Sequence, residues 1–301
     1  MTLVGVDAGG SGSRAVVVRG GDVVERVDLG PLNLILHADA VDRLAGLLAR
    51  TGAEAAGLGL AGLRSAADAE QVAEALTART GARVAVGDDT DAALAGAFRG
   101  GPGVVVIAGT GSGAAGRDAT GRGVRVGGHG FLLGDEGGGY WIGREAVRAA
   151  LRAADGTGPP TALQDVVRAA FGQLLAAERQ VHERPTDRQL LARLVPAVAA
   201  AAGQPPAPAL DRGPVATAGG DAEARRILAE AAGHLVDLAG AVRAGLGPLP
   251  VAGVGGIFRC ALVRYAFTAA TGAVDPAEPP ELGALRLLDR SPGPTAEPPD
   301  R

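Results

Sequence analysis

Two glycine-rich turns carry the residues of this chain that are best suited to holding an anion. Each turn follows a short apolar run, Thr2–Val6 in one case and Val104–Ala108 in the other. Small residues let backbone amides approach an anion closely, and hydroxyl groups can add hydrogen bonds to phosphate oxygens. The candidate phosphate-binding residues are Gly9, Gly10, Ser11 and Ser13 in the first turn, and Gly109, Thr110, Gly111 and Ser112 in the second. Asp7, just before the first turn, can hold Mg²⁺ through water.

Either turn on its own is also compatible with an ordinary glycine turn that has no chemical role. The presence of the same kind of turn after two similar apolar runs favours a shared function for both. A third glycine corner, Gly253–Phe258, follows another apolar run. Such a corner is a weak signal when it is taken alone.

Acidic residues lie close to these turns in two clusters. Asp88, Asp89 and Asp91 precede an alanine-rich segment, and Asp135 and Glu136 follow the second turn. A carboxylate can take a proton from a reacting hydroxyl or accept hydrogen bonds from one. It can equally cap the N-terminus of a helix, and both interpretations stay open here. An acidic turn so close to a candidate phosphate turn indicates a site for a phosphate and a polar partner.

The composition excludes several kinds of chemistry. All 29 basic residues are arginine, so the lysine of a Walker-type loop, a Schiff base or a protein kinase is missing. The single cysteine, Cys260, excludes an internal disulfide and a cysteine-built zinc site. A net charge of −4, with arginines scattered among acids, argues against nucleic acid as a partner. No apolar stretch reaches the ~18–20 residues of a membrane span, and Thr2–Val6 is predicted to be a strand rather than a signal peptide. We therefore expect a cytoplasmic protein with no membrane partner.

The elements that must position these residues begin with a strand meander. Two strands joined by a turn such as residues 7–14 form a β-hairpin, unlike the strand-to-helix turn of a dinucleotide-binding fold. The predicted strands are 2–6, 15–18, 23–29, 55–60 and 83–86, and the predicted helices are 40–51, 68–80 and 92–98. This order indicates an α/β unit with crossover connections.

The rest of the chain repeats this beginning and then becomes mostly helical. The predicted strands are 104–108, 114–117, 123–126 and 249–254, and the predicted helices are 140–154, 161–177, 186–202, 221–246 and 258–271. A short closing helix is predicted within 282–288. Two parts that each begin with a hairpin and a glycine turn indicate a duplicated architecture. The proline-rich end of the chain is predicted to be disordered.

In this order, the three glycine motifs resemble the phosphate-1, phosphate-2 and adenosine motifs of the actin-like sugar kinase and Hsp70 superfamily. Within it, the chain is most similar to the N-acetylglucosamine kinase branch, which includes the activating ATPases of benzoyl-CoA reductase. The most specific piece joins the Ile107–Ser112 turn to Gly134-Asp135-Glu136-Gly137-x-x-Tyr140-Trp141-Ile142-Gly143. The resemblance covers most of residues 2–290.

The resemblance implies an α/β fold of two related actin-like (ribonuclease H-like) domains with a nucleotide cleft between them, the second enriched in helix. The first domain is expected at 1–103, with the phosphate-1 motif and the catalytic aspartate. The second is expected at 104–290, with the phosphate-2, sugar and adenosine motifs. The closing helix, 281–289, is compatible with packing back against the first domain. Residues 291–301 are expected to form a disordered tail.

The resemblance also implies roles for individual residues. Aligning the alanine-rich helix makes Asp89 the catalytic base, with Asp91 as the alternative. Gly255 and Gly256 are expected to bind adenosine. The residues expected to contact the sugar are Asn33, Asp89, Gly128, His129, Gly130, Asp135 and Glu136. His129 stands where many relatives have tryptophan, which leaves the stacking surface for the sugar, and so the substrate, open.

The implied function is transfer of the γ-phosphoryl group of ATP, with Mg²⁺ as cofactor, to the 6-hydroxyl of an amino sugar, foremost N-acetylglucosamine. Glucosamine and N-acetylmuramic acid are rival substrates. The alternatives from other classes are a reductase-activating ATPase and a non-catalytic sugar-sensing protein. The expected partners are the small-molecule sugar and ATP, and relatives suggest a homodimer.

Overall fold

Short runs of valine, alanine and leucine build two β-sheets that begin in the same way. The computed structural model describes residues 1–35, 37–203 and 219–289. The first sheet has the strand order β3-β2-β1-β4-β5 and the second has the order β8-β7-β6-β9. In each sheet an antiparallel hairpin is followed by a third antiparallel strand and by a parallel strand on the other side. The duplicated α/β architecture expected from the sequence is therefore confirmed.

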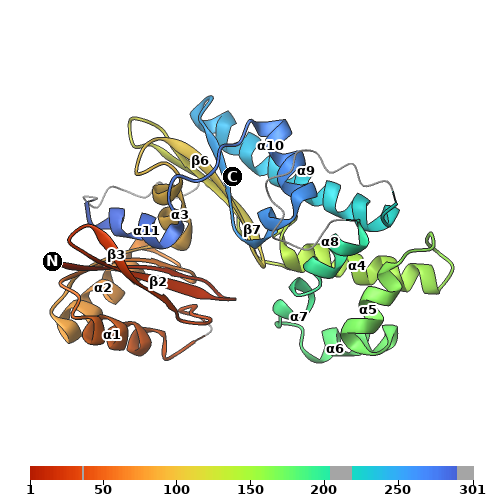
Figure 1. The fold of residues 1–301 in the computed structure, drawn as a ribbon, viewed down its shortest axis with the longest axis horizontal. Helices are drawn as coiled ribbons and strands as arrows, with labels where there is room; N and C mark the ends of the chain where they lie inside the picture. Colours follow the sequence, from red (N-terminus) through yellow and green to blue (C-terminus); the bar gives the residue numbers. More distant parts are fainter. Residues whose placement is uncertain (36, 204–218, 290–301) are drawn as a thin grey trace.

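The first lobe consists of the first sheet and the helices around it (Figure 1). Its strands are β1 Thr2–Ala8, β2 Ser13–Arg19, β3 Asp22–Asp28, β4 Ala55–Leu60 and β5 Arg83–Gly87. Its helices are α1 Ala40–Thr51, α2 Ala66–Thr80 and α3 Asp89–Ala97. Apolar side chains of β1, β4, α1 and α2 form one buried core, in which Val4, Leu44 and Leu58 are fully enclosed.

The second lobe is the second sheet with a larger set of helices. Its strands are β6 Gly103–Ala108, β7 Ser112–Arg117, β8 Gly123–Gly127 and β9 Val251–Val254. Its helices are α4 Gly139–Ala154, α5 Leu163–Phe171, α6 Leu174–Glu183, α7 Gln189–Ala192, α8 Val195–Ala201, α9 Ala222–Leu246 and α10 Ala261–Thr271, with a 3₁₀ turn at Gly256–Arg259. A second core joins these helices to the sheet.

Two helices that the sequence predicted as continuous are broken. The helix expected at 161–177 ends at Phe171, because Gly172 takes a left-handed φ of 84° and α6 starts separately after it. The helix expected at 186–202 is divided into α7 and α8. Pro196 lies in the first turn of α8, where its missing N–H costs no helical hydrogen bond. The helix expected at 258–271 begins later, at Ala261, after the 3₁₀ turn.

The C-terminal end of the described chain crosses back to the first lobe. Helix α11, Pro280–Leu285, packs against α3 and β1 and continues into a 3₁₀ turn, Arg286–Asp289. It approaches α3 so closely that a Cβ on Gly283 would overlap the backbone of Gly96. The domain limits after residue 103 and at 290 stay predictions, and the tail at 291–301 lies outside the described residues.

Helix α3 joins the two lobes through a small third core. Ala93, Leu94 and Ala97 of α3 pack with Val105 of β6 and Ala252 of β9. The same helix also contacts β1 and β4 of the first sheet, so it packs against both sheets. The first turn of the same helix carries the acidic cluster singled out in the sequence.

Candidate active site

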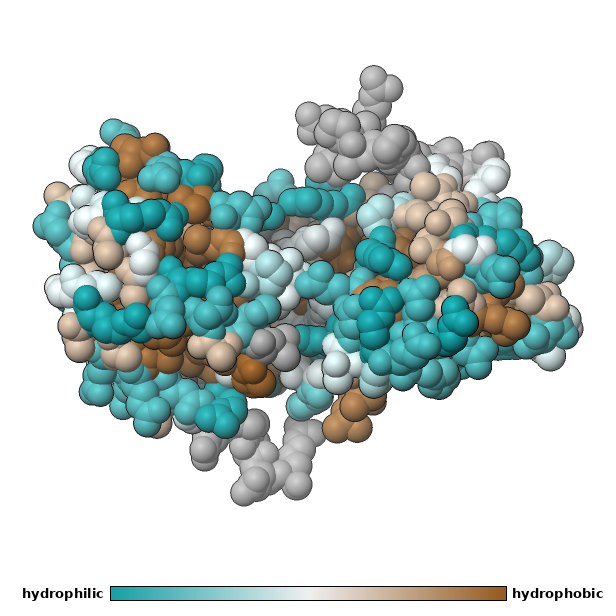
Figure 2. All heavy atoms as spheres, turned by 90° about the horizontal axis from the view of Figure 1, so that it is seen from below, coloured by the Kyte–Doolittle hydropathy of each residue, from teal (hydrophilic) through white to brown (hydrophobic). Residues whose placement is uncertain are grey.

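A large cavity lies between the two lobes, where the hairpin of each sheet ends. Its volume is about 1660 Å³. Figure 2 shows the hollow between the lobes from one side, with hydrophilic residues on its rim. Both glycine-rich turns, the corner after β9, the start of α3 and the segment around α7 line it. The fold therefore brings all three glycine motifs of the sequence to one place.

The first turn, residues 9–13, connects β1 to β2 and is held by bonds among its own residues and by backbone bonds from Leu29 and Leu32 to the carbonyls of Ser13 and Gly9. The backbone N–H of Gly9 donates to the carbonyl of Gly12 at 3.2 Å, and the Ser13 hydroxyl donates to the carbonyl of Gly9 at 3.4 Å. Ser13 is buried, whereas Ser11 and Gly12 are exposed. Gly9, Gly10, Ser11 and Ser13 all line the cavity, as the sequence predicted for a phosphate turn.

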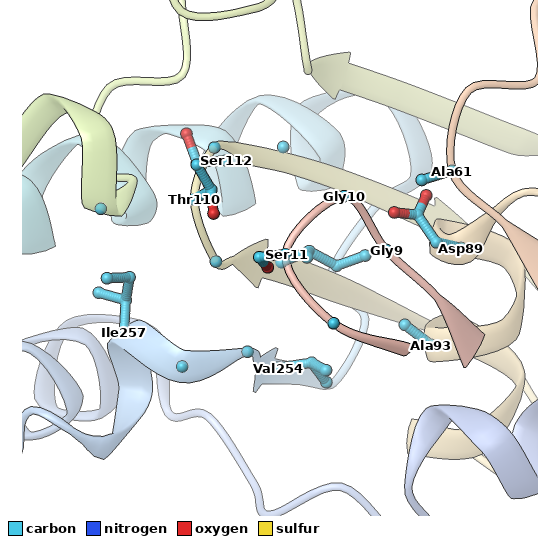
Figure 3. A pocket seen from close by; sticks show the side chains of 18 of the residues that line it. Gly9, Gly10, Ser11, Ala61, Asp89, Ala93, Thr110, Ser112, Val254 and Ile257 are labelled. Carbon is cyan, nitrogen blue, oxygen red and sulfur yellow. The ribbon is translucent and has the colours of Figure 1, made fainter. Parts of the chain in front are cut away.

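The second turn, residues 109–112, is held by the segment that leads into α4. The backbone N–H groups of Gly139 and Tyr140 donate to the carbonyls of Gly109 and Thr110 at 2.8 and 2.9 Å. The Ser112 hydroxyl donates to the carbonyl of Glu136 at 2.6 Å. Each of the four residues of this turn lines the same cavity as the first turn, and Figure 3 labels Thr110 and Ser112 of the second turn and Ser11 of the first.

Asp89 lies in the first turn of α3 and lines the cavity, and Figure 3 shows its side chain near Gly9 and Ala61. One carboxylate oxygen accepts the Thr90 backbone N–H at 3.0 Å. Burial raises the pKa of the Asp89 carboxyl above its ordinary value. A carboxylate made more basic at the wall of a cavity is suited to take a proton from a bound hydroxyl.

The other two acids of this cluster face different partners. Asp88 caps α3, because its side chain accepts the Asp91 backbone N–H at 2.7 Å, and it pairs with Arg125 of β8. Asp91 pairs with Arg125 at 3.0 Å and with Arg117 at 3.6 Å and is absent from the cavity wall. The capping interpretation therefore holds for Asp88, and ion pairs to the second lobe distinguish Asp91 from Asp89.

The residues expected to contact a sugar are divided between the cavity and the surface. Asn33, Gly128, Gly130 and Asp135 line the cavity. The Asn33 side-chain oxygen accepts the Ile35 backbone N–H at 2.9 Å, which orders the loop after β3. His129 and Glu136 are exposed and do not contribute to the cavity wall among the described residues.

Asp135 connects the acidic segment to the second turn. Its carboxylate accepts the Ser112 backbone N–H at 3.4 Å, and its own backbone has a left-handed φ of 62°. Burial raises the pKa of the Asp135 carboxyl, while the bond from Ser112 and the charge of Arg188 act in the opposite direction. Asp135 is therefore placed to hold the second turn as well as to meet a ligand.

The corner after β9 closes the far end of the cavity. Gly255 has a φ of 113°, and a side chain there would overlap the backbone of Ala108 in β6. Gly255, Gly256, Ile257 and Cys260 line the cavity here. The corner is thus joined directly to the strand that leads into the second turn.

Sequence reasoning missed the part of the wall that comes from α7 and its surroundings. Arg188 and Gln189 line the cavity opposite the first turn. The Gln189 side chain donates to the carbonyl of Gly10 at 3.1 Å across the cavity. These residues belong to no glycine or acidic motif, and they lie far from the first turn in the sequence.

The donor set near the first turn fits Mg²⁺. Asp7, on β1, has a pKa raised to about 7, first by burial and then by the negative charges of Asp89 and Glu281. A bound cation would relieve the repulsion between these two carboxylates beside the phosphate turn. Mg²⁺ is commonly held by one or two carboxylates together with phosphate oxygens. Among the described residues there is no cluster of three or more His, Cys, Asp or Glu side chains that could hold a metal by itself.

Two related sheets, with a glycine turn from each lining one cavity, define an actin-like protein of two lobes. The sequence resemblance to that superfamily is confirmed. The chain belongs to the BadF/BadG/BcrA/BcrD ATPase family, which it matches over residues 4–285.

Individual relatives agree with this assignment. Over 82 residues the chain is 45% identical to the N-acetylmuramic acid/N-acetylglucosamine kinase of Clostridium acetobutylicum, and the match covers 27% of each protein. The chain thus spans about a quarter of the length of that curated relative. A Chromobacterium violaceum protein proposed to be an N-acetylglucosamine kinase has a similar structure, with a TM-score of 0.75 and 27% identity over 95% of this chain and 98% of that one.

A more distant structure shares the fold alone. The ROK family glucokinase of Streptomyces griseus, solved with glucose and AMPPNP, has a TM-score of 0.59 and 17% identity, covering 96% of this chain and 98% of that one. None of the helices in the described ranges combines the length and the apolar character needed to cross a membrane.

Proposed function

We propose that this protein is an ATP-dependent kinase that transfers the γ-phosphoryl group to the 6-hydroxyl of an amino sugar, foremost N-acetylglucosamine. The observation that carries the proposal is the position of Asp89. Its half-buried carboxylate, with a raised pKa, lies at the wall of a cavity that two phosphate-type turns share. Membership of an ATPase family and the names of the relatives support the same activity.

In the proposed reaction, Asp89 accepts the proton of the sugar hydroxyl as its oxygen bonds to the γ-phosphorus. The bond between that phosphorus and the bridging oxygen breaks, and ADP leaves with the bridging oxygen. The amides and hydroxyls of the two turns hold the phosphate oxygens, and Gly255 and Gly256 bind the adenosine part of ATP. Asp7, with Asp89 beside it, would hold Mg²⁺, which offsets phosphate charge. Asn33, Gly128, Gly130 and Asp135 orient the sugar, and His129 and Glu136 are proposed contacts at its outer edge.

N-acetylmuramic acid is the second candidate substrate, because the Clostridium acetobutylicum relative carries both sugars in its name. A reductase-activating role is less well supported. That role requires an iron–sulfur cluster held between subunits by accessible cysteine thiolates. Cys260, at the start of α10, is only 5% exposed. A homodimer and the domain limits 1–103 and 104–290 remain proposals that rest on the resemblance. A cytoplasmic location remains a proposal that rests on the sequence.

The first test is ADP release with N-acetylglucosamine, N-acetylmuramic acid, glucosamine and glucose as acceptors. We expect turnover with at least one acetylated amino sugar, and the Asp89→Asn variant should lower kcat about 10²–10⁴-fold, the range a general base contributes. Binding of ATP should persist in that variant.

Asp91→Asn is the matched control, because Asp91 lies on the same helical turn but faces Arg125 and Arg117. It should keep kcat within about 10-fold, since the ion pairs it loses are partly exposed. Equal losses in the two variants, with both proteins folded by circular dichroism, would remove Asp89 from the role of base. An absence of turnover with all four acceptors would contradict the proposed kinase function.

A further inference from the structure

A cross-cavity contact links the first turn to α7 of the second lobe. Arg188 is the residue before α7, and Gln189 is its first residue. Gln189 donates to the Gly10 carbonyl, and the Arg188 guanidinium nitrogen Nη2 lies 3.6 Å from the position that a Cβ on Gly10 would occupy. In Figure 1 the hairpin of β1 and β2 points towards α7 across the cleft. The Arg188 charge is thus held at the tip of the first turn.

Arg188 also acts on the second turn. Its charge lowers the pKa of Asp135, and the Asp135 carboxylate accepts the Ser112 backbone N–H. Arg188 lies next to Gly10 and lines the same cavity as the second turn. A nucleotide held by both turns brings its last phosphate towards this part of the wall.

The other arginines of the cavity wall occupy different positions. The wall contains Arg14, Arg125, Arg188 and Arg259. Arg125 pairs with Asp88 and Asp91, and Arg259 lies in the 3₁₀ turn after the glycine corner. Arg14 is exposed and lies opposite Asp7 in the pairing of β1 with β2. Arg188 forms no ion pair with any residue that the structure describes, although it is half-buried.

We propose that Arg188 binds the γ-phosphoryl group of ATP and stabilises the charge on it during transfer. This inference rests on the proposed kinase function, in which the two turns hold the triphosphate. A planar guanidinium can donate two parallel hydrogen bonds to phosphate oxygens, and the chain has no lysine that could take this place. Arg188 gives up no proton in the step. It donates hydrogen bonds to the equatorial oxygens while the bond to ADP breaks and the bond to the sugar oxygen forms.

The decisive experiment compares two nucleotides without any sugar. Binding of AMPPNP and of ADP, each with Mg²⁺, is measured by calorimetry for the wild type, Arg188→Ala and Arg188→Lys. Arg188→Ala should weaken AMPPNP binding about 10- to 100-fold, as expected for hydrogen bonds to a charged group, and leave ADP binding within about 3-fold. The AMPPNP affinity of Arg188→Lys should lie between those of the wild type and Arg188→Ala, because lysine keeps the charge but cannot donate two parallel hydrogen bonds.

Arg184→Ala is the matched control, since Arg184 lies in the same segment and pairs with Asp187 but is absent from the cavity wall. It should bind both nucleotides like the wild type. In turnover with the best sugar, Arg188→Ala should lose kcat about 10²-fold or more, with the KM of the sugar little changed, and added guanidinium ions should restore part of the rate.

Three results would overturn the assignment of Arg188. The first is an equal loss of AMPPNP and ADP binding, and the second is no loss of either. The third is a defect confined to N-acetylmuramic acid, which would assign Arg188 to the carboxylate of that sugar. A selective loss of AMPPNP binding upholds the assignment even if no sugar is phosphorylated, so failure of the kinase proposal and failure of this one are distinguishable.

Discussion

The two glycine turns have similar composition and equivalent places in their sheets, yet their surroundings differ. The second turn receives backbone hydrogen bonds from Gly139 and Tyr140 at the start of α4, and Ser112 is anchored to Glu136 and Asp135. The first turn has bonds among its own residues, backbone bonds from Leu29 and Leu32 to the carbonyls of Ser13 and Gly9, and one side-chain bond from Gln189 of the opposite lobe.

This difference assigns separate roles to the two turns. A turn held by a helix and a buried carboxylate keeps its shape without a ligand. A turn with exposed residues and fewer external bonds belongs to the less stable part of a structure and can adapt when a ligand arrives. We infer that the second turn is the fixed part of the phosphate site and that the first turn completes it.

Substitution of one glycine in each turn should give the largest contrast. A Cβ on Gly111 would overlap the Asp135 carboxylate, whereas a Cβ on Gly12 meets no atom within 4 Å. Gly111→Ala should lower kcat about 10²–10³-fold and the free energy of unfolding by about 1–3 kcal/mol, because a packed site is overfilled. Gly12→Ala should change kcat by less than about 3-fold and the free energy of unfolding by less than about 0.5 kcal/mol.

Urea unfolding and the ADP-release assay measure these two quantities on the same preparations. If Gly12→Ala proved as damaging as Gly111→Ala, the first turn would be as tightly constrained as the second. The contrast between the two turns would then be lost.

Removal of the carboxylate that holds the second turn should have the next largest effect. Asp135→Ala deletes the acceptor for the Ser112 N–H and places alanine at a φ of 62°. We expect a loss of about 1–3 kcal/mol in the free energy of unfolding and weaker AMPPNP binding. Asp135→Asn should retain most of the stability, because asparagine accepts the same bond and tolerates the left-handed conformation. Equal effects of the two substitutions in thermal unfolding would contradict a bracing role for Asp135.

The smallest predicted effect concerns the residue before the first turn. Asp7 occupies the place that Ile107 has in the second hairpin, and its pKa is raised to about 7. A carboxyl with a raised folded-state pKa binds protons more tightly in the folded state. The wild type should therefore lose stability as the pH rises from about 4 to about 7.

Asp7→Asn removes this loss and should be more stable than the wild type at pH 7 by about 1–2 kcal/mol, a value discounted because Asp7 is partly accessible to solvent. The difference should shrink towards pH 4. Urea titrations in magnesium-free buffer across this range provide the measurement, and a pH-independent difference would contradict the expected charge burial.

The sequence predicted most of the strands and the three glycine corners, because a buried strand followed by small residues is a local signal. It left capping and chemistry open for the acids near residue 89, and the structure bears out capping for Asp88. Asp89 and Asp91 could not be separated, because both precede the same helix. The distinction depends on Arg117 and Arg125, which a different sheet supplies.

Other parts of the site leave no signal in the sequence. Arg188 and Gln189 reach the first turn through the packing of α4 with α7, and no spacing in the chain indicates that contact. The breaks at Gly172 and Pro196 were missed for a related reason. The apolar periodicity on each side continues, although Gly172 ends one helix and Pro196 stands in the first turn of another.

The return of α11 to the first lobe has a consequence for the synthesis of the chain. The first lobe leaves the ribosome before the second, but the helix that packs on β1 and α3 emerges only after the second lobe. Until then, one face of that lobe stays uncovered while the second lobe is already being made. The first lobe is therefore completed only after the second lobe has been translated, and a fragment that ends after residue 103 would lack the helix that covers one face of β1 and α3.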